Sequence, residues 1–126
     1  GDQNAASQVD YQCLFAYNAH GTLTWTSVVA WLSSEVAGGT SAAIWVDSTA
    51  ASAVGSASAQ ALTIASKTTA PAASSFSSPT TKGSGLSVGN LTAGQVRGIW
   101  VRRTAANTAA VDSDGVTVRC EGDTAA

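Results

Sequence analysis

Hydrophobic and polar residues alternate near the start of the chain, in residues 11–17. Tyr11, Cys13, Phe15 and Tyr17 fall on one face of an extended segment there, because successive side chains of a strand point to opposite sides of its sheet. Alternation over this length is typical of a strand with one buried side. We therefore predict a strand over residues 11–17 that buries this aromatic and apolar face.

Further strand-like segments follow, separated by residues that favour turns. Longer strands are predicted over residues 23–32, 41–47, 96–103 and 116–121, and shorter ones around Leu62 and Ile64, around Phe76, and over residues 86–88. Within residues 23–32, the alternation places Trp25, Ser27, Val29 and Trp31 on one face. Residues 48–59 are rich in Ala and Ser and contain no large apolar anchor, so a loop or a thin edge segment is expected there.

Two further segments indicate how the later strands pack. In residues 90–95, Leu91 is placed to fill the core while Gly94 takes the tight turn before the next strand. In residues 116–121, alternation points Val116, Val118 and Cys120 inward.

About seven or eight short strands and no convincing helix predict an all-β protein. The expected fold is an antiparallel β-sandwich, either immunoglobulin-like or jelly-roll. The chain has 126 residues, which is the length of one domain. We expect a flexible polar arm over residues 1–9 and a single domain over residues 10–126.

The charge of the chain and the length of its apolar runs argue against two classes of partner. Six Lys and Arg residues stand against eight Asp and Glu residues, for a net charge of −2. Nucleic-acid binding is not expected, because a positive surface dominates that affinity. A membrane span needs ~20 apolar residues in a row, and no apolar run is longer than the five residues at 28–32. We therefore expect neither a nucleic acid nor a membrane as partner.

Catalytic and metal-binding chemistry has little support in the sequence. The single histidine, His20, lies in a turn-like segment without a nucleophile beside it, and no spacing selects a pair of carboxylates. We expect no enzyme activity and no cofactor. Asp112 and Asp114 are weak candidates for calcium, but they supply few of the six to eight oxygens it needs, so a turn is the preferred interpretation and no metal is expected.

The two cysteines, Cys13 and Cys120, lie near opposite ends of the chain. A disulfide between the first and last strands is one interpretation, and it would close a very long loop. The other is two buried free thiols that pack as small hydrophobic groups. Both interpretations stay open at this point.

Six residues are candidates for an interface: Trp25, Trp31, Trp45, Trp100, Arg102 and Arg103. All four tryptophans lie within predicted strands, which favours packing in the core or against another subunit over a platform for sugar rings. The two arginines are adjacent, so they point to opposite faces unless a bulge intervenes. They are expected to mark a strand end that faces a partner or solvent.

Four motifs resemble a known type of domain. They are Asp-Tyr-Gln-Cys-Leu-Phe at 10–15, Leu-x-Ala-Gly-Gln at 91–95, Ile-Trp-Val-Arg-Arg-Thr at 99–104 and Val-x-x-Glu-Gly-Asp-Thr at 118–124. Together they resemble a β-sandwich domain of virion structural proteins in tailed bacteriophages, and the resemblance covers most of residues 10–125. The family contributes no active-site residues.

The resemblance implies a component of a virus particle. The expected function is a capsid decoration, or cement, protein on the outer surface of the phage head, bound to the major capsid protein and to sister copies in a homo-oligomer. The alternative is a receptor-binding or glycan-binding module of a head or tail fibre, for which a glycan would be the ligand.

Overall fold

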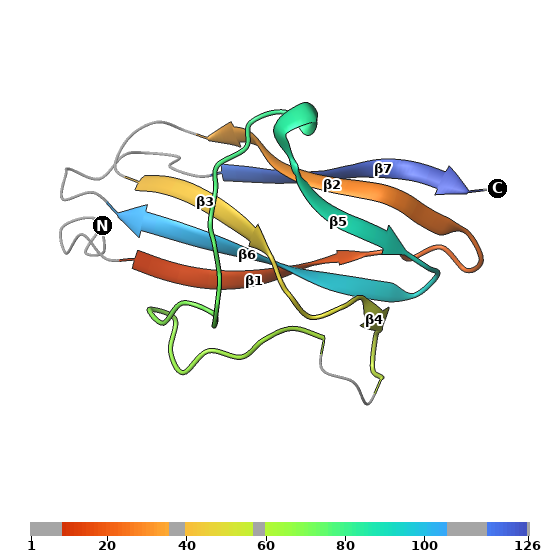
Figure 1. Ribbon diagram of the computed structural model, residues 1–126, viewed down its shortest axis with the longest axis horizontal. Helices are drawn as coiled ribbons and strands as arrows, with labels where there is room; N and C mark the ends of the chain where they lie inside the picture. Colours follow the sequence, from red (N-terminus) through yellow and green to blue (C-terminus); the bar gives the residue numbers. More distant parts are fainter. Residues whose placement is uncertain (1–8, 36–39, 57–59, 106–115, 126) are drawn as a thin grey trace.

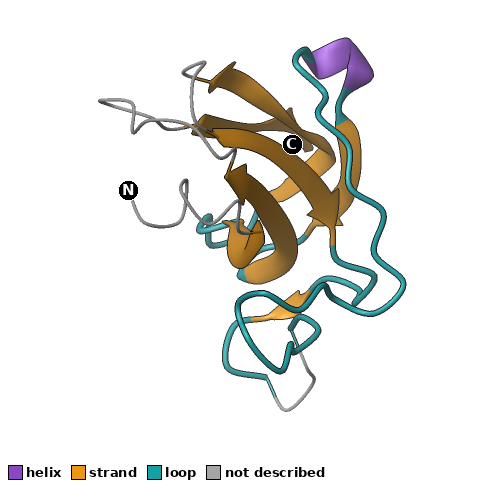
Figure 2. Ribbon diagram, turned by 90° about the vertical axis from the view of Figure 1, so that its left-hand side faces the viewer, coloured by secondary structure: helices purple, strands orange, loops and turns teal. Residues whose placement is uncertain are grey.

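Two antiparallel sheets pack face to face in the computed structural model, which describes residues 9–35, 40–56, 60–105 and 116–125 (Figures 1 and 2). Sheet A has the order β1 (Val9–Tyr17), β6 (Gln95–Ala105), β3 (Thr40–Val46), and the two-residue β4 (Ser52–Ala53) also pairs with β6. Sheet B has the order β5 (Leu86–Leu91), β2 (Thr24–Glu35), β7 (Val116–Ala125). These seven strands of the described residues confirm the predicted all-β antiparallel sandwich.

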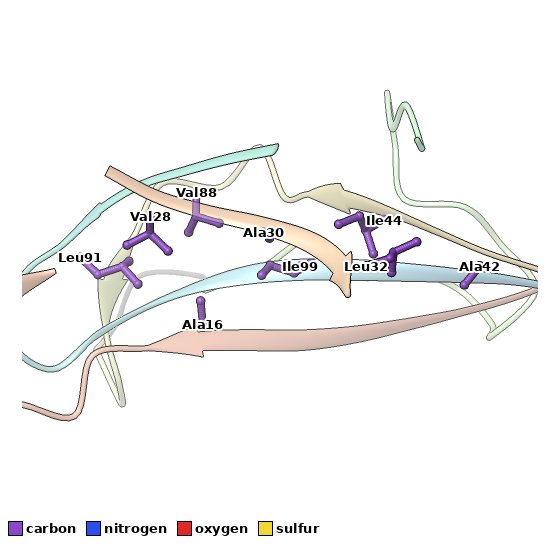
Figure 3. Close-up of a cluster of buried hydrophobic side chains, with 9 residues drawn as sticks. All are labelled: Ala16, Val28, Ala30, Leu32, Ala42, Ile44, Val88, Leu91 and Ile99. Atoms are coloured by element: carbon purple, nitrogen blue, oxygen red, sulfur yellow. The ribbon is translucent and has the colours of Figure 1, made fainter. Parts of the chain in front are cut away.

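The core lies between the sheets and is built from small and β-branched side chains of both (Figure 3). Its buried members are Ala16, Val28, Ala30, Leu32, Ala42, Ile44, Val88, Leu91 and Ile99. Val116, Val118 and Cys120 of β7 pack against this cluster from its margin, which confirms that they point inward. Burial of such apolar surface is the main force that holds the two sheets together.

The corner between β5 and β6 has the predicted form. Leu91 is fully buried in the core. Gly94 has a φ of +79°, a conformation that glycine adopts without steric cost. The corner is tied to the end of β1, because the N–H of Gly94 donates to the carbonyl of Asn18 at 2.9 Å. The buried side chain of Asn18 donates to the carbonyls of Leu23 and Leu91, each at 2.8 Å.

A β-bulge in β2 changes the predicted faces of that strand. Ser27 has a φ of +53°, and the pairing of β2 with both neighbours shifts register around it. Trp25 therefore packs against the core on the same side as Val28, whereas Trp31 lies on the opposite face. The prediction that Trp25 and Trp31 share a face was wrong, because one extra residue in a strand reverses its alternation.

The long connection between β4 and β5 contains no strand in its described residues, so the predicted strands at Leu62, Ile64 and Phe76 were wrong. It bonds first to β1, where the N–H of Tyr11 donates to the carbonyl of Lys67 at 2.7 Å, and then to β3, where Ser77 forms an isolated bridge with Ile44. It ends in a single 3-10 turn, η1 (Lys82–Ser84), beside sheet B (Figure 1). Its Phe76 packs against Tyr11 and Trp45 of sheet A instead of belonging to a strand.

The predicted N-terminal arm lies outside the described residues except for Val9. That residue is already the first of β1 and pairs with Thr104. Among the described residues, no helix has the length and apolar character needed to cross a membrane.

Candidate functional site: an exposed edge strand

The exposed apolar side chains of the described residues gather mainly on β1. Leu14 is 41% exposed, Phe15 49% and Tyr17 52%. We call these three residues the β1 strip. Among the residues that the structure describes, β1 is the outermost strand of sheet A and has β6 as its only neighbour in that sheet, so the strip lies along an open edge of this part of the sandwich.

The strip corrects the prediction that β1 buries its aromatic face. The buried residue of this part of the strand is Ala16, which belongs to the core between the sheets. Phe15 and Tyr17 point to the outer face of sheet A, and the backbone hydrogen bond from the long connection to β1 lies farther back, at Tyr11. Alternation identified the two faces of the strand correctly but not which face is covered.

Backbone groups of alternate residues of β1 also point to the open side of the strand. The N–H of Tyr11 points away from β6 to reach Lys67, and N–H groups of a strand alternate in direction. The N–H groups of Cys13, Phe15 and Tyr17 therefore point to the same open side. Outside the sheet pairing, no described residue accepts a hydrogen bond from any of these three amides.

The open edge lacks the charges that commonly protect edge strands from pairing. No Asp, Glu, Lys or Arg occurs in residues 11–19. In contrast, the outermost strand β7 of sheet B carries Arg119, Glu121 and Asp123, and Arg119 lies 3.8 Å from Glu121. An uncharged, apolar and unpaired edge is a candidate site for contact with another protein strand.

A second group of aromatic side chains lies on the outer face of sheet A. The ring of Phe76 stands 5.4 Å from that of Tyr11 and 6.3 Å from that of Trp45. The guanidinium group of Arg102 lies over the Phe76 ring at 5.2 Å, close enough for a cation–π interaction. The Nε of Arg102 is buried and has no hydrogen-bond partner among the described residues. We call these four residues the Arg102 cluster.

Asp47 fixes the connection that passes over this face. Its carboxylate is fully buried and accepts hydrogen bonds from the indole of Trp100 at 2.7 Å, the N–H of Thr49 at 2.7 Å and the N–H of Leu62 at 2.9 Å. Burial alone would raise the pKa of Asp47, but these hydrogen bonds outweigh it and hold the pKa below its ordinary value. This buried carboxylate therefore holds Thr49 and Leu62 close to Trp100 of β6.

Arg97 ties the same region to sheet B. Its Nη1 donates to the carbonyl of Val88 in β5 at 2.8 Å, and its Nη2 donates to the carbonyl of Asp47 at 3.0 Å. Beside it, Gly98 leaves room for the connection, because a Cβ there would lie 3.2 Å from both the Cys13 sulfur and the Ala61 Cβ. Sequence reasoning missed the roles of Asp47 and Arg97, since a single charged residue beside an apolar segment carries no signal of burial.

The predicted interface residues do not form one surface. Trp31 and Trp100 are buried at 7% and 4% exposure, and Trp25 and Trp45 are half-buried. Arg119 covers Trp31 on the outer face of sheet B, with its guanidinium 5.8 Å from the ring. These tryptophans pack within the domain, in agreement with the packing interpretation.

Arg102 and Arg103 point to opposite faces, as predicted. Arg102 joins Phe76 on the outer face of sheet A. Arg103 pairs in register with Ala42 of the core, and its Nη1 lies 3.8 Å from the Asp10 carboxylate. The two arginines therefore contribute to different surfaces.

Cys13 and Cys120 are free, half-buried thiols, so the disulfide interpretation was wrong for this structure. Cys13 lies on the outer face of sheet A, where its sulfur is close to Gly98. Cys120 packs against the core from sheet B. Sheet A separates the two side chains, and a disulfide would require the two Cα atoms to lie within about 7 Å.

The weak metal candidates Asp112 and Asp114 lie outside the described residues. Within the residues that the structure describes, no group of three His, Cys, Asp or Glu side chains is arranged to hold a metal ion. His20 closes the turn after β1, where its Nδ1 accepts hydrogen bonds from the N–H groups of Thr22 and Leu23 at 3.1 and 2.9 Å.

No protein-family model, no curated protein and no solved structure matches this chain. The candidate site is therefore defined by its geometry: an open, uncharged edge strand with the β1 strip exposed.

Proposed function

We propose that the chain is a non-enzymatic structural protein of a tailed-phage particle, a capsid decoration protein on the outer surface of the head. The observation that supports this proposal is the β1 strip on an open sheet edge. Exposed apolar surface of this kind marks sites of protein–protein contact. The resemblance of four sequence motifs to virion sandwich domains supplies the particle as the setting.

The proposed mechanism is reinforcement by contact. Each copy buries part of its surface against the major capsid protein or a sister copy, where a specific interface covers ~1,600 Å² in total. Weak contacts repeated over many linked copies add up through effective concentration. Buried hydrogen bonds such as those of Asp47 hold the loops to the sandwich, so the surface that makes these contacts keeps its shape.

Binding to undecorated heads tests the proposal. Purified protein is mixed with heads of the phage whose genome encodes this chain, assembled without it, and binding is followed by co-sedimentation. We expect saturable binding and a higher temperature of head disruption, measured by the release of packaged DNA. Heads that bind no protein, or that release DNA at the same temperature with and without it, would contradict the proposal.

A matched pair of variants links binding to the β1 strip. Tyr17→Ser removes an apolar side chain that is 52% exposed, whereas Val54→Ser removes one that is 58% exposed outside β1. We expect Tyr17→Ser to weaken head binding at least tenfold, whether the strip contacts the head directly or joins sister copies on it, and Val54→Ser to leave it unchanged. Equal binding by both variants would place the contact elsewhere on the molecule.

The Arg102 cluster favours a second candidate function, a glycan-binding module of a head or tail fibre. Aromatic rings can stack on the apolar faces of sugars, and a guanidinium can bind a carboxylate. An array of neutral and acidic glycans tests this candidate, with Trp45→Ala as the variant expected to lose binding. Binding of no glycan, or binding that Trp45→Ala leaves intact, would reject this cluster as a glycan site.

A further inference from the structure

We infer that β1 pairs with β1 of a second copy, antiparallel and across a two-fold axis at Phe15, so that the two A sheets form one continuous sheet. The inference goes beyond the proposed function, because it concerns the isolated protein and holds whether or not the chain binds a phage head. It names the occupant of the open edge described above.

The β1 strip exposes apolar groups on both faces of one strand. Leu14 points to the side of the sandwich interior, and Phe15 and Tyr17 point to the outer face of sheet A. A partner that docked on one face would leave the other face exposed. A strand placed beside β1, in the plane of the sheet, covers both at once, as in known cases of strand addition.

The free backbone groups set the register. The amide of Tyr11 is already bonded to Lys67, and β1 ends at Tyr17. The outward amides that remain are those of Cys13, Phe15 and Tyr17, and their centre is Phe15. An antiparallel pair centred there places Phe15 opposite Phe15 of the partner subunit and Cys13 opposite Tyr17 of the partner subunit. Each such pair exchanges two hydrogen bonds.

This register also matches side chains by size. On the outer face, the small Cys13 stands opposite the large Tyr17 of the partner subunit, and the two Phe15 rings meet at the axis. On the inner face, Leu14 stands opposite Ala16 of the partner subunit. Cross-strand aromatic and apolar pairs of this kind stabilise sheets.

The charge pattern favours a second copy as the occupant. A two-fold axis brings each residue near its own copy, so a charge close to the axis would face a like charge. Residues 11–19 contain no Asp, Glu, Lys or Arg, and the net charge of each copy is only −2. The segment can therefore lie against itself without electrostatic repulsion.

Sedimentation equilibrium of the purified full chain over a range of concentrations tests the pairing. We expect a reversible dimer that Phe15→Lys weakens at least about tenfold, because it places two like charges opposite each other at the axis. Phe15 is 49% exposed, so the thermal unfolding of dilute Phe15→Lys protein should stay near that of the wild type at equal dilution. Val54→Lys adds the same charge at a residue that is 58% exposed and should remain dimeric.

A wild-type protein that stays monomeric at millimolar concentration would overturn the inference. A dimer that Phe15→Lys leaves intact would do the same, and so would a dimer that Val54→Lys weakens equally. Since no phage head is present in this assay, its result is independent of the head-binding experiment, and either proposal can fail alone.

Disulfide trapping tests the register. In a Cys13→Ser, Cys120→Ser background, Phe15→Cys should form a disulfide-linked dimer on oxidation, because residues paired at the axis lie ~5.5 Å apart between Cα atoms. Leu14→Cys in the same background serves as the control, because Leu14 is offset from its own copy. Cross-linking of Leu14→Cys that equals or exceeds that of Phe15→Cys would overturn the register.

Discussion

The indole N–H of Trp100 donates a 2.7 Å hydrogen bond to Oδ2 of Asp47, and both side chains are buried. The same carboxylate accepts hydrogen bonds from the N–H groups of Thr49 and Leu62. One side chain thus joins the central strand of sheet A to the loop between β3 and β4 and to the connection that covers the outer face of the sheet. This buried carboxylate holds the covering layer in place together with the backbone hydrogen bonds that the connection forms with β1 and β3.

Loss of the Asp47 carboxylate should destabilise the fold in proportion to the acceptors removed. We expect Asp47→Ala to lower the free energy of unfolding by about 2–4 kcal/mol, because a buried donor without an acceptor costs ~1–3 kcal/mol. Asp47→Asn keeps one oxygen and should cost about half as much. Urea unfolding followed by tryptophan fluorescence measures both changes. In a double-mutant cycle with Trp100→Phe, a coupling energy near zero would show that the hydrogen bond contributes nothing.

Acid should weaken the contribution of Asp47. Burial opposes the charged form, but the hydrogen bonds from Trp100, Thr49 and Leu62 outweigh it and keep the pKa below its ordinary value of 3.8. A carboxyl group with a depressed pKa stabilises the fold above its unfolded pKa and loses this effect as the pH falls through the folded pKa. The stability advantage of the wild type over Asp47→Asn should therefore be constant near neutral pH and shrink below about pH 4. An advantage that does not change down to about pH 2.5 would contradict the shift.

Arg97 should stabilise the sandwich through its fork of donors between the sheets. It reaches the carbonyl of Val88 in sheet B and that of Asp47 at the end of β3. Arg97→Lys keeps the charge but has one ammonium in place of the planar fork, so we expect a loss of about 1–2 kcal/mol in the free energy of unfolding. Arg119→Lys is the control, since Arg119 is exposed and both its ion pair and its contact with the Trp31 ring lie on the outer surface of sheet B. Equal losses in the two variants would show that the inter-sheet bonds add no stability.

The combined pattern of alternation, β-branched and aromatic residues, and turn signals predicted every strand longer than two residues in the described part of the chain. It was wrong where an apolar residue packs without belonging to a strand. Leu62 and Phe76 lie in the connection and cover sheet A, and a short apolar segment looks the same in both situations. It was also wrong on the faces of β2, because no residue near Ser27 signals a bulge and the serine adopts a positive φ of 53°.

The candidate site was predictable only in part. The sequence identified Phe15 and Tyr17 as one face of a strand, but their exposure depends on where the connection is bonded to β1, which is at Tyr11. That hydrogen bond is a long-range contact, and local periodicity contains no information about it. The tryptophans drew attention as interface candidates because of their size, yet Trp31 and Trp100 are buried within the domain.

Cys13 should react slowly with thiol reagents in the folded protein. Burial raises the pKa of its thiol from 9.0 to about 11, and the negative charge of Asp47 adds to this shift. The thiolate is the reactive form, so a two-unit rise reduces the reactive fraction at pH 8 roughly 100-fold relative to the unfolded chain. The Cys120→Ser variant isolates Cys13, and its rate of alkylation with and without denaturant measures the ratio. Equal rates in the two conditions would show that the thiol is accessible and ordinary. If the wild-type chain instead showed no reactive thiol before reduction, Cys13 and Cys120 would be joined by a disulfide, against their placement on opposite sides of sheet A.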